Sequence, residues 1–569
     1  MCPTCDGDVR VVKSRIRRVV TLAQGPFDAR EVFVRCRSVA ACPMVGSSAL
    51  AQLVPPRQRH GYDLVVHVGL ARYLRHRQRE EIRTELMTEH GIELSSGTVS
   101  NLCDRFLVYL EALHLCRVPH LRAAMTGGYP LHVDVTCDKG KGGVAVCVDG
   151  WRNWVLVAGR VPTENTDDIR PIVDQTVDLF GQPLSTMRDL SSKIGGALVG
   201  LHDRGVPDLV CHYHYLGAVG KALFDEAYSR LRRMLRCYRL RPDLHLLLRD
   251  LRGYGDASQD DGRFGPGRVR ANLRALVLWI LDDDSRKNLA YPFALPLYDF
   301  ARRCLEAHDR FDAWVPFPHS RAERRALRHM ESLSARLVRD PRIIDTNREL
   351  QARWQVFTEL RGVLRLTEAE LPGGDERRAQ RPTPESGFHR LRRIEEAFDA
   401  FIVNMTKRAE GCDGRGSHAR AEGIVLKYLK RYRGKLFGHP ARRDHDGTII
   451  AVVPRTDNPP EHLFGRRKQA LRRRVGRAHL GRDLQQQPAQ VMLTDNLRDP
   501  VYIRVVCGSL QNLPAAFAAL DPANVDQPTL VRDHRDSALI RRVRALLKEP
   551  DTSLRPLEIE SSVPSATAV

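Results

Sequence analysis

The sequence predicts a multidomain α/β protein, and three observations support this prediction. The chain has 569 residues, several times the ~100–200 residues of an average domain. Between residues 121 and 226, short apolar segments alternate with amphipathic ones, a pattern typical of strands joined by helices. From 227 to 440 the periodicity is mostly helical and rich in arginine. We therefore expect an α/β domain together with a large helical segment.

The charge of the chain indicates a polyanionic partner. Lysine and arginine number 90 against 69 acidic residues, a formal net charge of +21, and only 12 of the 90 are lysine. Arginine presents a planar fork of donors that suits phosphate oxygens, although genome composition can also raise arginine content. A charged fraction of 28% beside 42% hydrophobic residues is ordinary for a globular protein and argues against general disorder.

The sequence shows no pattern for export or membrane insertion. No run approaches the ~18 apolar residues that cross a bilayer. The first residues, MCPTCDGDVRVV, lack the basic-then-apolar layout of a secretory signal. We therefore expect the 13 cysteines to be reduced thiols in a cytoplasm.

Residues 1–45 have the cysteine spacing of a zinc ribbon. A C-x2-C pair and a C-x5-C pair stand thirty residues apart and comprise Cys2, Cys5, Cys36 and Cys42. Four such sulfurs can bind one tetrahedral Zn²⁺ at about 2.3 Å each. The segments VRVVKSRIRRVVTL and REVFVRC alternate apolar and basic residues, which predicts two short strands. So small a module buries little core and needs the metal for stability. The alternative interpretation is that the four cysteines are unrelated thiols.

Residues 46–120 contain three helical segments that predict a helix-turn-helix. DLVVHVGLARYLRHR is followed by REEIRTELMTEH, which stops at Gly91, and by a helix capped by Ser95 or Ser96. Packing of the second helix on the third across a short turn builds this motif. In this motif the side chains of Thr98, Asn101 and Arg105 on the third helix would face a DNA groove. Three packed helices that do not touch DNA are the alternative.

Five apolar segments between 121 and 226 predict the strands of a sheet. They are YPLHVDVTCD, GGVAVCVDG, WRNWVLVAGRV, LSTMRDL and the start of DLVCHYHYLGAVGKALF. The second and third form a hairpin around Asp149-Gly150. DDIRPIVDQTVDLFG and SSKIGGALVGLHDRG predict intervening helices. Three antiparallel strands followed by strand–helix alternation match the first part of a ribonuclease H-like (RNase H-like) core.

The rest of the chain predicts a return to this core after the helical insertion of 227–440. In 441–515, TIIAVVPRTDN has a strand pattern, PPEHLFGRRKQALRRRVGRAHL is helical, and VYIRVVCG with a short helix closes the fold. Residues 516–569 predict a C-terminal helix at SALIRRVRALLKE and a disordered tail. Trp279 and Trp314 in the insertion are expected in its core rather than stacked on a base.

Three acids occupy the positions at which metal ligands are expected. Asp134 lies in the first strand, Asp189 ends the fourth, and Glu461 opens the last long helix. In an RNase H-like sheet the first and fourth strands are neighbours and the final helix crosses them, so the three carboxylates would converge. Carboxylates suit Mg²⁺, and two such ions ~3.5–4 Å apart stabilise an in-line phosphoryl displacement.

Each acid also has a purely structural interpretation. Asp134 could only end a strand, and Asp138 could take its place as a ligand. Asp189 could cap the helix that follows it. Glu461 could form a capping box with Asn458, which is followed by two prolines.

The helix that begins near Glu461 is strongly basic. Residues 461–477 contain one acid and seven cations: Arg466, Arg467, Lys468, Arg472, Arg473, Arg474 and Arg477. Such a run is usually a solvated face. Beside a metal-binding carboxylate it would instead bind DNA by guiding the phosphates of the reacting strand.

Four motifs together resemble those of a bacterial insertion-sequence transposase of the DDE type. They are DVT at Asp134, RDLSSKIGGAL at Asp189, CHYH at Cys211–His214, and RTDNPPEHLFGRRKQALRRRVGRAHL around Glu461. The cysteine ribbon and the helix-turn-helix occupy the places at which such enzymes keep DNA-binding modules. The resemblance spans nearly the whole chain.

The resemblance implies metal-dependent cleavage of transposon ends and strand transfer into target DNA. Asp134, Asp189 and Glu461 would be the catalytic ligands of Mg²⁺ or Mn²⁺, and Cys211 with His214 a structural pair beneath them. The protein would be cytoplasmic, nucleoid-associated and homo-oligomeric. Rival interpretations are an RNase H-like nuclease or resolvase, a DNA-binding regulator without activity, and a transposase that has lost activity.

Overall fold

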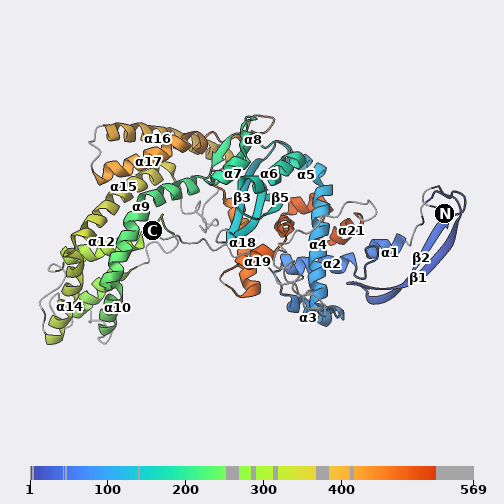
Figure 1. The fold of residues 1–569 in the computed structure, drawn as a ribbon, viewed down its shortest axis with the longest axis horizontal. Helices are drawn as coiled ribbons and strands as arrows, with labels where there is room; N and C mark the ends of the chain where they lie inside the picture. Colours follow the sequence, from blue (N-terminus) through green and yellow to red (C-terminus); the bar gives the residue numbers. More distant parts are fainter. Residues whose placement is uncertain are drawn as a thin grey trace, which may run out of the picture.

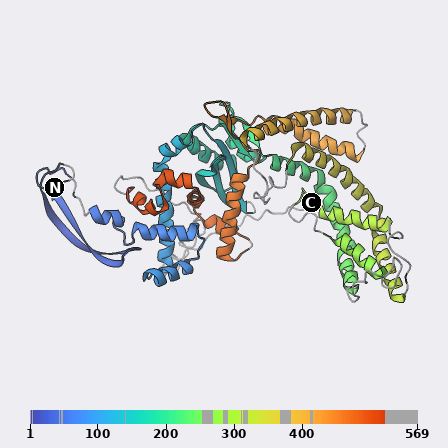
Figure 2. The ribbon, with the colours of Figure 1, turned by 180° about the vertical axis from the view of Figure 1, so that it is seen from behind.

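The structure is a computed structural model that describes most of the chain. The described residues are 2, 5–42, 44, 48–138, 141–251, 268–282, 290–309, 311, 318, 320–366, 383–410, 416–477 and 479–520. The molecule is elongated, with a hairpin at one end, a sheet in the middle and a helical lobe at the other end (Figures 1 and 2). The expected C-terminal helix, the tail and Trp314 lie outside the described residues, as does the side chain of Asp138.

The N-terminal hairpin confirms the two predicted ribbon strands. β1 (Val9–Thr21) pairs antiparallel with β2 (Gly25–Cys36), and Gly25, the first residue after the turn, has a φ of +69°. The turn end joins the body of the protein, because Gly61 N donates to Val20 O at 2.8 Å. The end that carries the N-terminus lies far from the body (Figure 1). Most side chains of β1 are exposed, so the hairpin has little core of its own.

The three predicted helices of the next segment are confirmed as helices. After the short α1 (Ser48–Leu53), the chain forms α2 (Tyr62–Tyr73), α3 (Arg79–His90), α4 (Ser96–Cys116) and α5 (Val118–Ala124). α3 ends at Gly91 in the left-handed conformation, and Ser95 caps α4 by accepting a hydrogen bond from Thr98 N at 3.1 Å. Buried Ile82 and Leu86 of α3 share a core with residues of α4, and the two helices contact each other.

The central sheet has five strands, all of which the sequence predicts. They are β3 (Pro130–Asp138), β4 (Lys141–Asp149), β5 (Trp154–Val161), β6 (Ser185–Arg188) and β7 (Asp208–Val210). Their order is β5-β4-β3-β6-β7; β3, β4 and β5 run antiparallel, whereas β6 is parallel to β3 and β7 to β6. The helices between β5 and β7 are α6 (Thr166–Phe180), α7 (Ser192–Ala197) and α8 (Val199–His202).

After β7 the chain forms a helical lobe with its own core. Its helices are α9 (His212–Tyr238), α10 (Leu240–Asp250), α11 (Arg268–Leu281), α12 (Pro296–Asp309), α14 (Arg321–Val338), α15 (Pro341–Leu364), α16 (Pro384–Glu410) and α17 (Ser417–Leu436). α9 runs without interruption across the predicted boundary at 226/227, and its buried side chains from Tyr215 onward belong to the core of this lobe. Trp279 is 40% exposed, so the expected core position is wrong: α11 turns this side chain to the surface.

The last described segment returns to the sheet and completes its core. β8 (Ala441–Arg443) and β9 (Ile449–Val452) pair with each other in a separate sheet. There follow α18 (Asn458–Val475), α19 (Gly481–Gln486), η3 (Ala489–Arg498), α20 (Pro500–Cys507), η4 (Leu510–Asn512) and α21 (Leu513–Ala518). α18 contacts β3 and β4, η3 contacts β5, and α21 contacts α2 and α4.

These contacts make one continuous core of strands β3 to β5, helices α2 to α8, and parts of α18, η3, α20 and α21, whereas Met187 of β6 and Leu209 of β7 lie in a smaller cluster. The segment 46–120, expected as a separate module, therefore shares its core with the sheet, because apolar faces of α2 and α4 pack on α21 and η3. Among the described residues, no helix combines the length and the apolar character that crossing a membrane requires.

Candidate functional site

Two of the predicted acids lie on neighbouring strands at the same level of the sheet. Asp134 is in β3, and Asp189 directly follows β6. The two strands are parallel, with His132 opposite Met187. Asp134 and Asp189 each lie two residues further along in the same direction. The central strand pairing therefore brings together residues that are 55 positions apart in the sequence.

Contacts with the strand ends hold the beginning of α18, which carries Glu461. Glu461 Oε1 lies 3.2 Å from His214 Nε2 of α9. Directly before the helix, Asp457 N donates to Cys211 Sγ at 3.3 Å. The predicted Cys-x2-His pair thus contacts the segment that carries Glu461, with the cysteine buried and the histidine half-buried.

The electrostatics of these acids indicate that they face one another. Burial raises the pKa of Asp134 well above its usual value, and the charges of Asp457, Asp189 and Glu461 raise it further. The pKa of Glu461 is raised to about 7, first by burial and then by Asp189. Each of these carboxylates makes it less favourable for its neighbours to ionise. A bound cation would offset this repulsion and allow all of them to be charged.

The carboxylate oxygens of the three acids lie further apart than the ligand atoms of a single bound ion would. Among the described residues, two groups of His, Cys, Asp or Glu have ligand atoms all within 4.8 Å of one another, and the three acids are not among them. Two Mg²⁺ ions ~3.5–4 Å apart, each ~2.0–2.1 Å from its oxygens, need a wider ring of ligands. The donors are carboxylates, as hard divalent cations prefer.

Sequence reasoning missed a fourth acid, Asp457, which is buried at the start of α18. Its Oδ1 lies 2.7 Å from Nδ1 of the buried His132. Burial lowers the pKa of His132 to about 3 and raises that of Asp457, which Glu461 and Asp189 raise further. Burial thus disfavours the charged form of both side chains. The signal in the sequence was an acid four residues before Glu461.

The structural interpretations of Asp189 and Glu461 as caps do not hold. Asp457, not Asn458, is the residue before α18, and its side chain makes no capping hydrogen bond. α7 is capped by Ser191, whose Oγ accepts a hydrogen bond from Lys193 N at 3.3 Å. Asp189 Oδ1 accepts instead from Ser191 N at 2.8 Å.

A buried arginine fixes the backbone around Asp189. Arg188 donates from Nε and Nη2 to the two carboxylate oxygens of Asp208, both at 2.9 Å. Its Nη1 donates to Asp189 O at 3.0 Å and to Ser191 O at 3.2 Å. Lys435 of α17 joins Asp208 at 2.8 Å, so the helical lobe is tied to the loop of Asp189.

The four N-terminal cysteines form a cluster with the geometry of a zinc site. Their Sγ atoms all lie within 4.8 Å of one another, with Cys5–Cys36 at 3.5 Å and Cys5–Cys42 at 3.7 Å. A tetrahedron with ~2.3 Å Zn–S bonds has sulfurs about 3.8 Å apart. Val39 N donates to Cys36 Sγ at 3.3 Å and lowers the pKa of that thiol. The cluster can therefore bind zinc at the free end of the hairpin.

A second compact group, Asp444, His445 and Asp446, lies in the turn between β8 and β9. His445 and Asp446 are exposed, and Asp444 is half-buried. Asp444 Oδ1 accepts hydrogen bonds from Asp446 N at 3.0 Å and from Thr448 N at 2.9 Å. These bonds give Asp444 a structural role in the turn.

The predicted DNA-binding cations of α18 differ in accessibility. Arg467 is buried, donates to Thr494 Oγ1 at 2.6 Å and lies 3.7 Å from Asp495, so its prediction as a DNA contact is wrong. Arg474 is half-buried; burial and Arg72 lower its pKa to about 10. Lys468 is half-buried. The exposed members of the run are Arg466, Arg472, Arg473 and Arg477.

The predicted groove residues of α4 are also unequal. The side chain of Asn101 is exposed. Thr98 is half-buried, and its hydroxyl lies 2.9 Å from that of Ser95 within the helix cap. Arg105 Nη2 donates to Gln58 Oε1 at 2.6 Å and is half-buried.

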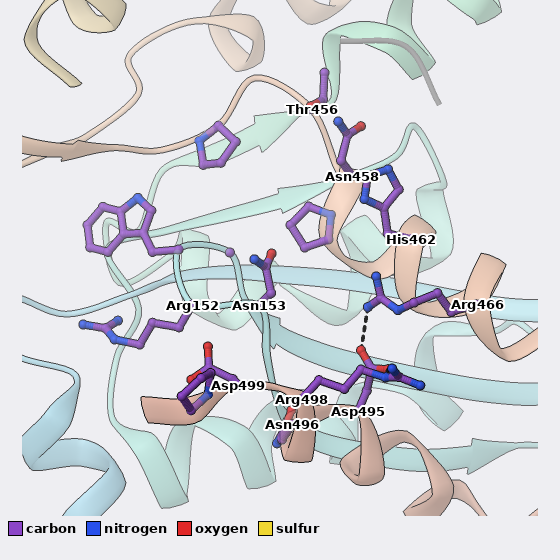
Figure 3. A pocket seen from close by; sticks show the side chains of 15 residues that line it. Arg152, Asn153, Thr456, Asn458, His462, Arg466, Asp495, Asn496, Arg498 and Asp499 are labelled. Atoms are coloured by element: carbon purple, nitrogen blue, oxygen red, sulfur yellow. Dashed lines mark hydrogen bonds and ion pairs between the residues drawn. The ribbon is translucent and has the colours of Figure 1, made fainter. Parts of the chain in front are cut away.

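A pocket of about 690 Å³ adjoins the first turns of α18 (Figure 3). It lies between the β4–β5 turn, the segment before α18, and the end of η3. Side chains of mixed charge line it, among them Arg152, Asn458, His462, Arg466, Asp495 and Arg498. Sequence reasoning did not identify it, because its walls come from three distant segments, residues 150–153, 454–466 and 495–500.

Comparison with known proteins gives no identification: no protein-family model matches the chain, and no curated protein matches it significantly.

Proposed function

We propose that the protein is a DDE-type DNA transposase with an RNase H-like catalytic domain. In this proposal it cleaves phosphodiester bonds at transposon ends and joins those ends to target DNA. The observation that carries the proposal is the register of β3 and β6, which sets Asp134 and Asp189 side by side, together with the contact of α18, the helix of Glu461, with β3. These acids come from a central strand, its parallel neighbour and a helix that follows 271 intervening residues (190–460).

The topology of the sheet supports the RNase H-like assignment. Numbered within the domain, the strands lie in the order 3-2-1-4-5, and only the second runs against the others. The first and fourth strands are adjacent, and α18 contacts the first. This is the arrangement in which we expect two aspartates and a helical glutamate to converge.

The carboxylates would bind two divalent cations, which lower the pKa of a bound water and offset phosphate charge. Water would then attack phosphorus and release a proton while the bond between phosphorus and the 3′-oxygen breaks; Asp134, Asp189 and Glu461 are the residues that would hold the cations. The leaving oxygen takes a proton and becomes a 3′-hydroxyl. In strand transfer this hydroxyl attacks a target phosphodiester and loses its proton, and a new bond forms as another breaks. Exposed arginines of α18 would hold the strand's phosphates.

The N-terminal elements supply surfaces for duplex recognition in this proposal. The cysteine cluster can anchor the hairpin, and α4 exposes Asn101 on the helix expected to face a groove. A nuclease or resolvase of the same fold would share the catalytic acids, so reaction products separate the two functions. A regulator without activity would bind DNA but would not cleave it.

The test uses the purified protein with DNA duplexes taken from the genomic boundaries of its reading frame. With Mg²⁺ we expect nicks at a fixed distance from each boundary and joined products when target DNA is added. Inverted repeats at those boundaries are a further expectation. Cleavage of branched DNA without joining would favour a resolvase, and binding without cleavage in Mg²⁺ or Mn²⁺ would contradict the proposal.

Arg472 provides a separate test of the basic face of α18. We expect Arg472→Ala to reduce the slope of log K against log salt by about one, because one phosphate contact is lost. Filter binding or fluorescence anisotropy at several salt concentrations measures the slope. Arg325→Ala, an exposed arginine of α14, is the matched control. An unchanged slope for Arg472→Ala would remove this residue from the DNA contact.

A further inference from the structure

The pocket beside α18 contains an arginine cluster with more positive charge than its acids balance. Asp495 alone faces three guanidinium groups. Their distances to its carboxylate are 2.5 Å for Arg466, 3.4 Å for Arg498 and 3.7 Å for Arg467. One carboxylate therefore offsets one of three charges, and the cluster retains two positive charges.

The base of this cluster is buried and its rim is accessible. The side chains of Arg467 and Asp495 are 5% and 9% exposed, whereas those of Arg466 and Arg498 are 46% and 42% exposed. Arg467 is also bonded to the buried Thr494. Arg498 donates to Leu74 O at 3.3 Å, which fixes it from the side of α2. Two guanidinium forks are thus held in place at the rim of the pocket (Figure 3).

The other charged groups of the pocket do not cancel this surplus. Arg152 and the buried Asp149 form an ion pair at 2.7 Å. Asp499 Oδ1 accepts hydrogen bonds from Val501 N and Tyr502 N at the start of α20, where a negative charge is favoured. Even when Asp499 is counted, four arginines stand against three aspartates.

The pocket and the proposed catalytic Glu461 share helix α18. Arg466 and His462 lie on α18 within five residues of Glu461, and Asn458 in the first turn also lines the pocket. A strand whose scissile phosphate lies at Glu461 would carry its next phosphates along this helix. The volume of about 690 Å³ is within the ~300–1,000 Å³ range of pockets that enclose a small ligand.

We propose that this pocket binds a backbone phosphate of the DNA strand close to the scissile bond, through Arg466 and Arg498. The inference rests on the proposed function and adds a specific anion site to it. The guanidinium group of each arginine can donate two charge-assisted hydrogen bonds to the oxygens of one phosphate. The buried pair of Arg467 and Asp495 positions the forks without contacting DNA.

The test is a scan of the boundary duplex with single methylphosphonates, which replace one charged phosphate oxygen at a time. For the wild-type protein we expect one position within a few nucleotides of the cleaved bond to weaken binding about tenfold. In Arg466→Ala, binding should already be about tenfold weaker, and the same methylphosphonate should have no further effect. Arg498→Gln, which retains hydrogen-bond donors, should show the same loss of coupling.

Arg504→Ala is the matched control, since Arg504 is an exposed arginine of α20 outside the pocket lining. It should leave the full effect of the methylphosphonate in place. The anion site alone would be overturned if the wild type cleaves the duplex but no methylphosphonate position loses its effect on binding in Arg466→Ala or Arg498→Gln. Failure of the wild type to cleave the boundary DNA would instead overturn the proposed function, and the anion site with it.

Discussion

Asp134→Asn, Asp189→Asn and Glu461→Gln will each abolish DNA cleavage while DNA binding remains nearly unchanged. Each variant removes one anionic ligand from the proposed two-metal site and keeps the size of the side chain. We expect the rate constant to fall by about 10³-fold or more, because the cations stabilise the transition state. Cleavage of labelled boundary duplex under single-turnover conditions measures the rate, and anisotropy without divalent ions measures binding.

The same variants test folding as well as activity. Burial and like charges raise the pKa values of Asp134 and Glu461, so their ionised forms cost stability without a cation. The amide variants should therefore unfold at the same or a higher temperature in metal-free buffer. Asp203→Asn, an exposed aspartate just after α8, is the matched control and should cleave normally. An Asp189→Asn protein with the wild-type rate would show that the assignment of Asp189 is wrong.

Cys2→Ser or Cys5→Ser will release zinc and unfold the N-terminal hairpin. β1 is mostly exposed, and an isolated two-stranded hairpin is at best marginally stable in water. Zinc bound by the four cysteines would cross-link the open ends of the two strands, so its binding energy would be folding energy. We expect the loss of one zinc per chain by elemental analysis and fast amide exchange in the exposed part of β1, from Val9 to Arg18.

The rest of the fold should survive this change, because the strands β3 to β5 and their helices have a continuous core to which the hairpin adds only Val20 and Leu22 at its turn end. The expected thermal transition of the body is therefore unchanged. Cys237→Ser, an exposed cysteine of α9, is the control and should retain full zinc content. Full zinc content in Cys2→Ser and Cys5→Ser would refute the metal site.

Local pattern was sufficient to predict the strands and the order in which they occur. The alternation of apolar residues in YPLHVDVTCD and GGVAVCVDG marks β3 and β4, and the four-residue β6 is wholly buried, as a central parallel strand should be. The same pattern was insufficient for β9. Its apolar run reads as a strand, but its partner is the short β8, which no local feature distinguishes.

The remainder of the site depends on contacts between distant segments. Arg467 reads as one more cation in a basic run, and Thr494 and Asp495, nearly thirty residues later, decide that it is buried. Asp457 reads as a polar residue before a helix, and His132, 325 positions earlier, makes it half of a buried pair. Helix α4 reads as part of a separate module, yet its buried face completes the core of the sheet domain.

The central claim is that Asp134, Asp189 and Glu461 together bind divalent cations. Anomalous diffraction from crystals of the full chain grown with Mn²⁺ tests it most directly. We predict anomalous peaks between these three carboxylates in the wild type and their loss in Asp134→Asn. Manganese found only at the turn of Asp444, His445 and Asp446, or at none of these residues, would contradict the claim.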